Sequence, residues 1–202
     1  MERQLPETIS NEALAELPLI QFEGKIVVVD RPGEIACACD ELMVSPALGF
    51  DTETKPVFQA GLVHKTALLQ LSTPDTCYLF RLSKIALERP LLRLLESRSV
   101  LKIGAAVRDD LKSLRSLRHF RPEGFVDLQR LVGNYGIAEK SVRKLSALVL
   151  GGRISKRQRL TNWDADILTS AQQLYAATDA WVVLQIYLQL QEKNRQLVTH
   201  NL

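Results

Sequence analysis

Apolar positions form short continuous runs in the first half of the chain and helical stripes in the second half. Short runs bounded by turn residues predict buried strands. The turn residues Thr73-Pro74-Asp75 separate two of these runs, which predicts a hairpin. The expected strands are 25–30, 47–54, 66–72, 76–82 and 100–106.

Helical spacing of apolar residues dominates after Ala106. Ser10 is a candidate cap for one short helix near the start. Gly151 is expected to end one of the later helices. The other expected helices are 34–43, 90–97, 107–114, 125–133, 141–150 and 169–193. Strands with interspersed helices, followed by helices alone, indicate a layered α/β domain.

The 202 residues are enough for one sizeable domain, with 46% hydrophobic and 24% charged residues as in ordinary soluble proteins. A net charge of +3 is too small to indicate a polyanionic partner by itself. One segment, however, is strongly basic and contains no acidic residue, so it is either a phosphate-facing patch or a solvated loop. Its cations are Lys140, Arg143, Lys144, Arg153, Lys156, Arg157 and Arg159.

The cysteines Cys37, Cys39 and Cys77 are odd in number and lack metal-site spacing, so we expect reduced packing residues. The first residues lack the basic start and apolar stretch of a signal peptide. No apolar run is long enough to span a membrane. The expected location is therefore the cytoplasm, with no membrane partner.

Four polar side chains fall where a packed core is expected. Asp51 and Glu53 are two apart at the end of a strand and share one face. Tyr175 and Asp179 are four apart and share one face of the long helix. Burying such carboxylates is costly without compensation, and a divalent metal would compensate all of them together. A strand-end cap for Asp51 and an arginine pair for Asp179 are the structural alternatives.

A metal site for phosphodiester chemistry would use a further carboxylate, and Asp109 and Asp110 are the candidates. Helix phase places Asp110 with the inward stripe of Val107, Leu111 and Leu114. Asp109 falls on the outward side, where it would favour the helix dipole. We therefore choose Asp110, for which a dipole role is the alternative.

Three separated segments carry a family resemblance. They are Asp51-Thr52-Glu53, then Lys102-Ile103-Gly104 leading to Asp110, then the run from Tyr175 to Asp179. In this order they resemble the exonuclease motifs of the DEDD superfamily, and the tyrosine spacing is that of its tyrosine subclass. That subclass includes the ribonuclease D and Werner-syndrome exonuclease group, and the similarity covers about residues 25–192.

Three further stretches look more like the Werner-type branch than ribonuclease D. They are 65–80, 144–151 and 161–163. The resemblance implies a ribonuclease H-like, three-layer α/β fold with a central mixed β-sheet flanked by helices. The chain then divides into an N-terminal extension, 1–24, and a 3′–5′ exonuclease domain, 25–202.

The resemblance also implies the chemistry of the site. Asp51, Glu53, Asp110 and Asp179 would hold two divalent cations, Mg²⁺ or Mn²⁺, for which carboxylate oxygens are suitable ligands. Tyr175 would orient the attacking water, alone or with Glu53. Orientation is the safer role, because tyrosine with a reference pKa of about 10 is a poor base at neutral pH. All four acids and the tyrosine are present.

The expected substrate is single-stranded or 3′-recessed nucleic acid, with DNA favoured by the Werner-like pattern. Lys144, Lys156 and Arg159 are candidate phosphate contacts, and Phe58 would press against a terminal base or pack within its own loop. Trp163 is expected to pack the basic segment against the core. A helicase on a separate chain is a candidate partner. The alternatives are a non-catalytic nucleic-acid-binding module on the same fold and a phosphohydrolase for small nucleotides.

Overall fold

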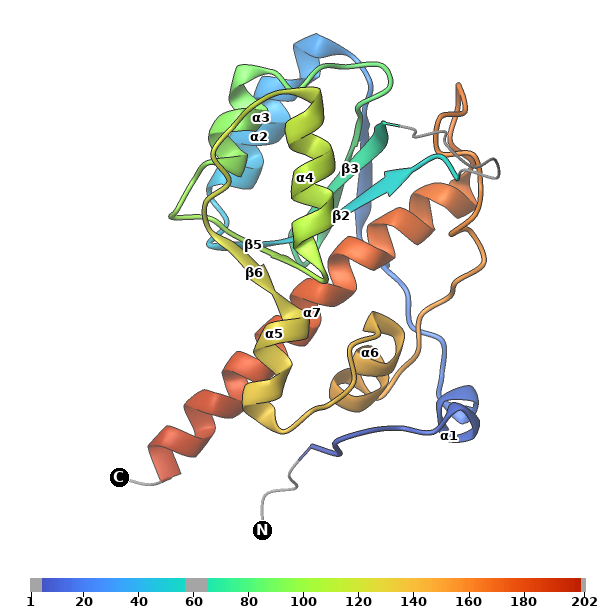
Figure 1. The fold of residues 1–202 in the computed structure, drawn as a ribbon, viewed down its shortest axis with the longest axis vertical. Coiled ribbons are helices and arrows are strands. Elements are labelled where there is room, and N and C mark those ends of the chain that lie inside the picture. The colour runs from blue at the N-terminus through green and yellow to red at the C-terminus, as the bar shows by residue number, and fades with distance from the viewer. Residues whose placement is uncertain (1–4, 57–64, 201–202) are drawn as a thin grey trace.

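A computed structural model describes residues 5–56 and 65–200. Its described strands form one six-stranded mixed sheet in the order β1-β4-β3-β2-β5-β6 (Figure 1). Only β3 runs antiparallel to both of its neighbours, and the other pairs are parallel. The strands are β1 (Lys25–Val29), β2 (Ala47–Thr54), β3 (Thr66–Ser72), β4 (Thr76–Arg81), β5 (Leu101–Gly104) and β6 (Phe125–Asp127).

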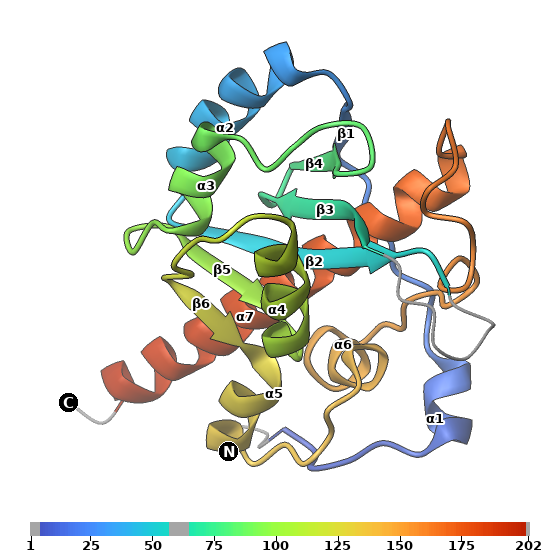
Figure 2. The same ribbon diagram turned by 45° about the horizontal axis from the view of Figure 1, so that its top comes forward.

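Helices cover both faces of this sheet. The helices α2, α3 and α4 lie on one face, and the long helix α7 crosses the other (Figures 1 and 2). The predicted three-layer α/β architecture with a mixed sheet is therefore confirmed. The helices are α1 (Asn11–Glu16), α2 (Ile35–Met43), α3 (Arg89–Leu95), α4 (Val107–Leu117), α5 (Leu128–Leu131), α6 (Val142–Leu150) and α7 (Ser170–His200), with 3₁₀ turns η1 (Pro32–Glu34) and η2 (Val132–Tyr135).

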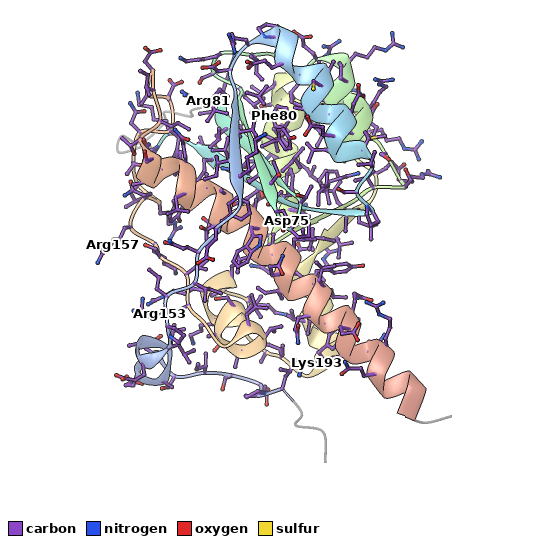
Figure 3. All side chains as sticks on the ribbon, turned by 180° about the vertical axis from the view of Figure 1, so that it is seen from behind. Asp75, Phe80, Arg81, Arg153, Arg157 and Lys193 are labelled. Atoms are coloured by element: carbon purple, nitrogen blue, oxygen red, sulfur yellow. The ribbon has the colours of Figure 1, made fainter. Side chains whose placement is uncertain are left out.

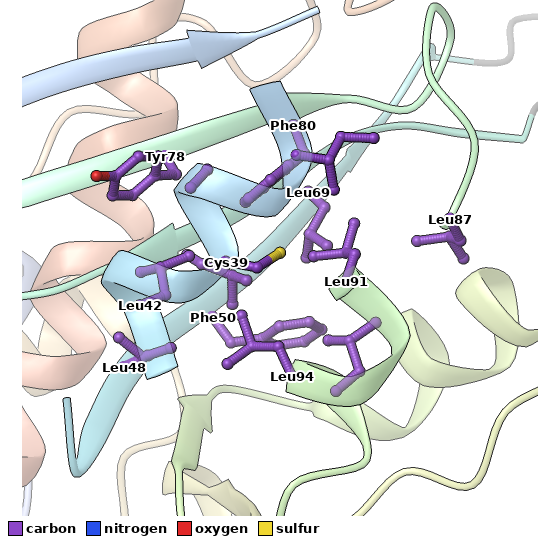
Figure 4. Close-up of a cluster of buried hydrophobic side chains, with 14 of the residues drawn as sticks. Cys39, Leu42, Leu48, Phe50, Leu69, Tyr78, Phe80, Leu87, Leu91 and Leu94 are labelled. Atoms are coloured by element: carbon purple, nitrogen blue, oxygen red, sulfur yellow. The ribbon is translucent and has the colours of Figure 1, made fainter. Parts of the chain in front are cut away.

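Successive side chains of each strand point to opposite faces of the sheet, so each face has its own apolar core. Phe50 and Leu69 are fully buried against α2 and α3, as Figure 4 shows, while Leu68 is buried on the α7 side. Because successive side chains of β2 point to opposite faces, burying Phe50 turns Asp51 toward α7. The expectation of packing cysteines holds for buried Cys39 and Cys77 but is wrong for Cys37, which is exposed.

Several local predictions are confirmed. The two runs around Pro74 form the antiparallel hairpin β3–β4. The hydroxyl of Ser10 accepts a hydrogen bond from the Ala13 N–H at 3.1 Å and caps α1. Gly151 ends α6 with a left-handed φ of 72°. Each of these signals depends on a few neighbouring residues, so sequence alone is sufficient to find it.

The prediction of one helix over residues 125–133 is wrong. Phe125–Asp127 instead forms strand β6, which pairs in parallel with β5 at the edge of the sheet. Asp127 then caps the short helix α5, because its carboxylate accepts from the Gln129 N–H at 2.9 Å. The same carboxylate accepts from the Ala106 N–H at 3.1 Å. This pairing with β5 is a tertiary interaction that helical spacing cannot report.

The segment before β1 packs on the rest of the chain. The Ile20 N–H donates to the Arg153 carbonyl at 2.9 Å, and Figure 3 shows Arg153 beside this segment. Phe22 is buried, with its ring centroid 6.2 Å from that of Trp181. The division of the chain into 1–24 and 25–202 stays a prediction. Within the described ranges, no helix is both long and apolar enough to cross a membrane.

Gly49 sets the distance between β2 and α7. A Cβ built at Gly49 would lie 1.8 Å from the Ala180 carbonyl oxygen, which is backbone and cannot move aside. We therefore expect Gly49→Ala to lower stability by about 3 kcal/mol and the melting temperature by roughly 6–12 °C.

Thermal unfolding followed by circular dichroism measures this effect. Gly33→Ala is the matched control, because no atom lies within 4 Å of a Cβ built at Gly33. Equal melting temperatures for the two variants would contradict the close approach of β2 to α7.

Candidate active site

The close approach at Gly49 brings acidic residues of two elements together. Asp51 and Glu53 follow Gly49 on the same face of β2, and Asp179 precedes Ala180 on α7. One carboxylate oxygen from each of the three acids lies within 4.8 Å of the others. The two sequence segments that carry acids in apolar surroundings therefore meet at one place.

Asp110 lies beside this cluster, on a helix that covers the opposite face of the sheet. The Thr52 hydroxyl donates to the Asp110 carboxylate at 2.5 Å, which fixes the acid beside β2. Asp109 is exposed, whereas Asp110 is partly buried, as helix phase predicts. Ala106 precedes α4 with a left-handed φ of 57°, the one positive φ outside glycine among the described residues. This turn aims the first turn of α4 at the acidic cluster.

Tyr175 lies one turn before Asp179 on the same face of α7, close enough for its hydroxyl to lower the pKa of the Asp179 carboxyl. The ring of fully buried Trp163 lies 5.9 Å from the Tyr175 ring, so Trp163 packs against the core as expected. Burial and the charges of Asp179 and Glu53 raise the pKa of Tyr175 above its usual value. In the metal-free protein the phenol therefore keeps its proton at neutral pH, which suits it to orient a ligand.

Burial raises the pKa values of all four carboxylates, and neighbouring acids of the cluster raise those of Asp51 and Glu53 further. Burial, followed by the charge of Asp179, raises the pKa of Glu53 to about 8. Burial also raises the pKa of Asp179 to about 7 and that of Asp110 to about 6. For Asp51, burial and the charges of Asp179 and Glu53 hold the pKa well above its usual range. The ionised form of these buried acids therefore requires nearby positive charge.

A divalent cation fits this donor set. The three clustered acids offer oxygen atoms alone, which suits hard cations such as Mg²⁺ or Mn²⁺. Lys156 lowers the pKa of Asp179 and Arg159 lowers that of Glu53, yet burial outweighs both effects. Protein cations therefore leave the cluster short of positive charge.

A pocket of about 360 Å³ opens beside the acids. Asp51, Tyr175 and Asp179 line one part of it, and Lys156 and Arg159 line another. Two of the three cations chosen from the sequence thus reach the same pocket as the acids. Anionic and cationic side chains facing one cavity suit a ligand that carries phosphate and is held with a metal.

Lys144 does not line this pocket. Its ammonium forms an ion pair with Glu139 at 2.8 Å. Lys140 and Arg143 line the pocket instead; both belong to the basic segment, but neither is among the three phosphate contacts expected from the sequence. Glu139 lies just before the basic segment, and this nearby acid is the one sequence signal that could have moved the choice away from Lys144. Phe58 lies outside the described residues.

Comparison with known proteins identifies the family. A sequence model of the family described as 3′-5′ exonuclease matches residues 26–195, so the chain belongs to the 3′-5′ exonuclease family. The resemblance seen in the motifs is thereby confirmed.

Two curated relatives are each 33% identical to this chain. The mouse bifunctional 3′-5′ exonuclease/ATP-dependent helicase WRN aligns over 86% of this chain and 13% of its own length. The human exonuclease 3′-5′ domain-containing protein 2 aligns over 93% of this chain and 33% of its own length. The chain thus spans a third or less of these relatives.

Solved structures share the fold. The EXO domain of Aedes aegypti Nibbler superposes with a TM-score of 0.74 and 26% identity, covering 89% of this chain and 93% of that domain. Escherichia coli RNase D superposes with a TM-score of 0.76 and 24% identity, covering 85% of this chain and 46% of its own. The fold expected from the resemblance is confirmed.

Tyr175→Phe is expected to lower the single-turnover rate at least about tenfold while leaving substrate affinity and metal binding nearly unchanged. The ring that packs on Trp163 remains, and only the hydroxyl that reaches Asp179 is lost. Rate, affinity and melting temperature should be measured on one preparation. A lower melting temperature with an unchanged rate would assign the hydroxyl a structural role instead.

The metal-free protein is expected to lose stability as the pH rises from about 5 to about 8. The pKa values of Asp110, Asp179 and Glu53 are raised to about 6, 7 and 8 in the folded protein, against about 4 when unfolded. The folded state therefore binds more protons in this window, and the resulting stabilisation, complete below pH 4, is lost as these groups ionise. Thermal melts at several pH values, in EDTA and in Mn²⁺, measure this loss of stability. A melting temperature in EDTA that stays constant or rises with pH would contradict the raised pKa values.

Proposed function

We propose that this chain hydrolyses nucleic acid from the 3′ end and releases 5′-mononucleotides, using two divalent cations, Mg²⁺ or Mn²⁺. The observation that carries the proposal is the cluster of Asp51, Glu53 and Asp179, with Asp110 beside it, in a pocket that is also lined by cations. Membership of the 3′-5′ exonuclease family supports the direction of hydrolysis.

Each side chain has a role that follows from its position. Asp51, Glu53, Asp110 and Asp179 would hold the cations, which would supply Lewis-acid stabilisation of the charge that develops on the phosphate. Tyr175 donates its hydroxyl and orients the attacking water, because a phenol with a reference pKa of about 10 is a poor base at neutral pH.

The basic part of the pocket binds the substrate. Lys140, Arg143, Lys156 and Arg159 line the pocket and offer donors to phosphate oxygens. Their charge also draws a polyanion toward an acidic cluster that would otherwise repel it. Lys144 has a smaller role in this proposal because Glu139 neutralises it.

DNA is the favoured substrate and RNA the second candidate. The Werner-like stretches and the similarity to the mouse WRN protein favour DNA, whereas similarity to a Bartonella henselae ribonuclease D, 28% identical over 89% of this chain, favours RNA. The choice depends on contacts with the 2′-hydroxyl. The name of the mouse relative joins an exonuclease to a helicase, which supports a helicase as a functional partner.

A non-catalytic binding module is the alternative function. It would gain nothing from the acidic cluster, because unscreened carboxylates repel phosphate. The complete set of Asp51, Glu53, Asp110, Tyr175 and Asp179 therefore favours hydrolysis.

Digestion of matched DNA and RNA strands, labelled at the 5′ end, tests the proposal in Mg²⁺, Mn²⁺ and EDTA. We expect a ladder that shortens stepwise from the 3′ end, a mononucleotide product, no cleavage of a closed circle and no activity in EDTA. Full activity in EDTA, or cleavage of the circle, would refute it. Binding of both strands without cleavage in either metal would establish the alternative.

A further inference from the structure

Gln70 is a fully buried polar residue in the middle of strand β3. Within residues 5–56 and 65–200, neither its amide nitrogen nor its amide oxygen has a hydrogen-bond partner. Burying an amide without a partner costs free energy that an apolar side chain of similar size would not cost. Gln70 is therefore a candidate for a role beyond packing.

The strand register places Gln70 directly opposite Asp51. Residues opposite one another in an antiparallel pair lie on the same face of the sheet, with Cβ atoms about 4.5–5.5 Å apart. This face is the one that α7 covers, and the acidic cluster lies on it. A glutamine side chain is long enough to span the separation, so rotation of the two side chains can bring the Gln70 amide to the Asp51 carboxylate.

The other side chains around Gln70 on this sheet face are less suitable partners. Leu79 lies opposite Gln70 on the other neighbouring strand, β4, and belongs with Leu68 to a buried apolar cluster. Glu53 lies opposite Leu68, so it is only a diagonal neighbour of Gln70, and such neighbours are about 7–8 Å apart. Asp51 is therefore the acceptor that the register favours.

Gln70 can serve the site only through Asp51. Asp51 lines the pocket beside the acids, whereas Gln70 is fully buried and does not line it. Carboxylates that bind a metal are themselves commonly held by a hydrogen bond. Loss of such a partner typically lowers metal affinity or activity by about 10- to 100-fold.

We propose that Gln70 is a positioning residue for Asp51. When the cluster holds a divalent cation, the amide nitrogen of Gln70 donates a hydrogen bond to the Asp51 carboxylate and fixes its orientation toward the ion. The proposal rests on the proposed metal-dependent function, because that function makes Asp51 a metal ligand. The hydrogen bond forms as the carboxylate turns to its ligand position, since the amide is unpaired in the structure.

The test compares Gln70→Met with the matched control Thr66→Val in the full chain. Among the described residues, the buried hydroxyl of Thr66 on β3 also lacks a partner, but it lies opposite Thr54 instead of an acid. Each variant replaces an unpaired buried polar group with an apolar one, so both should melt in EDTA at or above the wild-type temperature. Mn²⁺ binding in the presence of a 5′-mononucleotide should weaken about 10- to 100-fold in Gln70→Met alone.

Nuclear magnetic resonance of the wild type tests the hydrogen bond itself, even if Gln70→Met is unstable. The side-chain amide proton resonances of Gln70, assigned by their loss in Gln70→Met, should shift downfield when Mg²⁺ is added, because the acceptor is charged. This shift should be absent in Asp51→Asn. Amide resonances that do not respond to saturating Mg²⁺, wild-type Mn²⁺ affinity in Gln70→Met, or an equal loss of affinity in Thr66→Val would each overturn the proposal.

The two proposals fail in different ways. Hydrolysis by the wild type, with Mn²⁺ affinity unaffected in Gln70→Met, overturns the role of Gln70 alone. Weaker Mn²⁺ binding in Gln70→Met and an amide shift in the wild type, without hydrolysis of DNA or RNA in either metal, support the role of Gln70 and refute the exonuclease proposal. A wild type that binds no Mn²⁺ overturns both.

Discussion

Asp51→Asn is expected to lower turnover by about a thousandfold or more and, in the same protein, to raise the melting temperature in EDTA at alkaline pH. Asp51 lies with Glu53 and Asp179 in the carboxylate cluster, and its pKa is raised by burial and by the charges of Asp179 and Glu53. A neutral amide removes an oxygen ligand from the metal site. It also removes a charge that destabilises the folded, metal-free chain.

The combination of the two effects is diagnostic. A residue that holds the fold together lowers stability when it is replaced, whereas a residue retained for chemistry at the expense of stability raises it. The gain should grow with pH, because the raised pKa of Asp51 means that its charge costs most when the pH is high.

Asp75→Asn is the matched control, since Asp75 is exposed in the turn between β3 and β4 (Figure 3). It should leave both turnover and melting temperature nearly unchanged. Turnover is measured under single-turnover conditions, and melting by circular dichroism in EDTA. A lower melting temperature for Asp51→Asn at alkaline pH would contradict the account of the cluster.

Asp110→Asn is expected to reduce turnover by about a hundredfold or more, while Asp109→Asn changes it less than about threefold. Asp110 accepts a hydrogen bond from the Thr52 hydroxyl and lies beside the cluster, whereas Asp109 is exposed on the same helical turn. The two neighbours have the same chemistry, so the comparison tests position alone.

Both variants should fold, because each replaces a partly or fully exposed carboxylate with an isosteric amide. Melting temperatures in EDTA check this before rates are compared. If Asp109→Asn reduced turnover more than Asp110→Asn, the fourth carboxylate would have been assigned to the wrong residue.

Local signals account for much of what the sequence predicts about the fold. The Ser10 cap, the turn at Pro74 and the left-handed Gly151 each depend on a few adjacent residues. Strand β6 was not predicted because its residues lie at the sheet edge and are held by pairing with β5. That pairing lies far away in sequence and leaves no local pattern.

The acidic site is readable from the sequence for a different reason. Asp51, Glu53 and Asp179 are costly in apolar elements, so their presence there is itself the signal. The basic contacts leave no such signal, because a surface cation costs little anywhere. Which cations reach the pocket depends on helix phase and on ion-pair partners. Lys144 forms an ion pair with Glu139 and does not line the pocket, whereas Arg143 does.

The charged segments of α4 show the same limit. Helix phase could place Asp110 because an apolar stripe defines the inward side. It could not show that Arg108, Lys112 and Arg115 line one groove, because that also depends on Pro122, which lies beyond the end of the helix.

Equilibrium binding of Mn²⁺, followed by the electron paramagnetic resonance signal of the free ion, tests the central claim most directly. The account predicts saturable binding of two ions per chain in the presence of a 5′-mononucleotide, and loss of at least one ion in Asp51→Asn but not in Asp75→Asn. Binding that does not saturate, or that is identical in the wild type and Asp51→Asn, would contradict the claim that this carboxylate cluster is a divalent metal site.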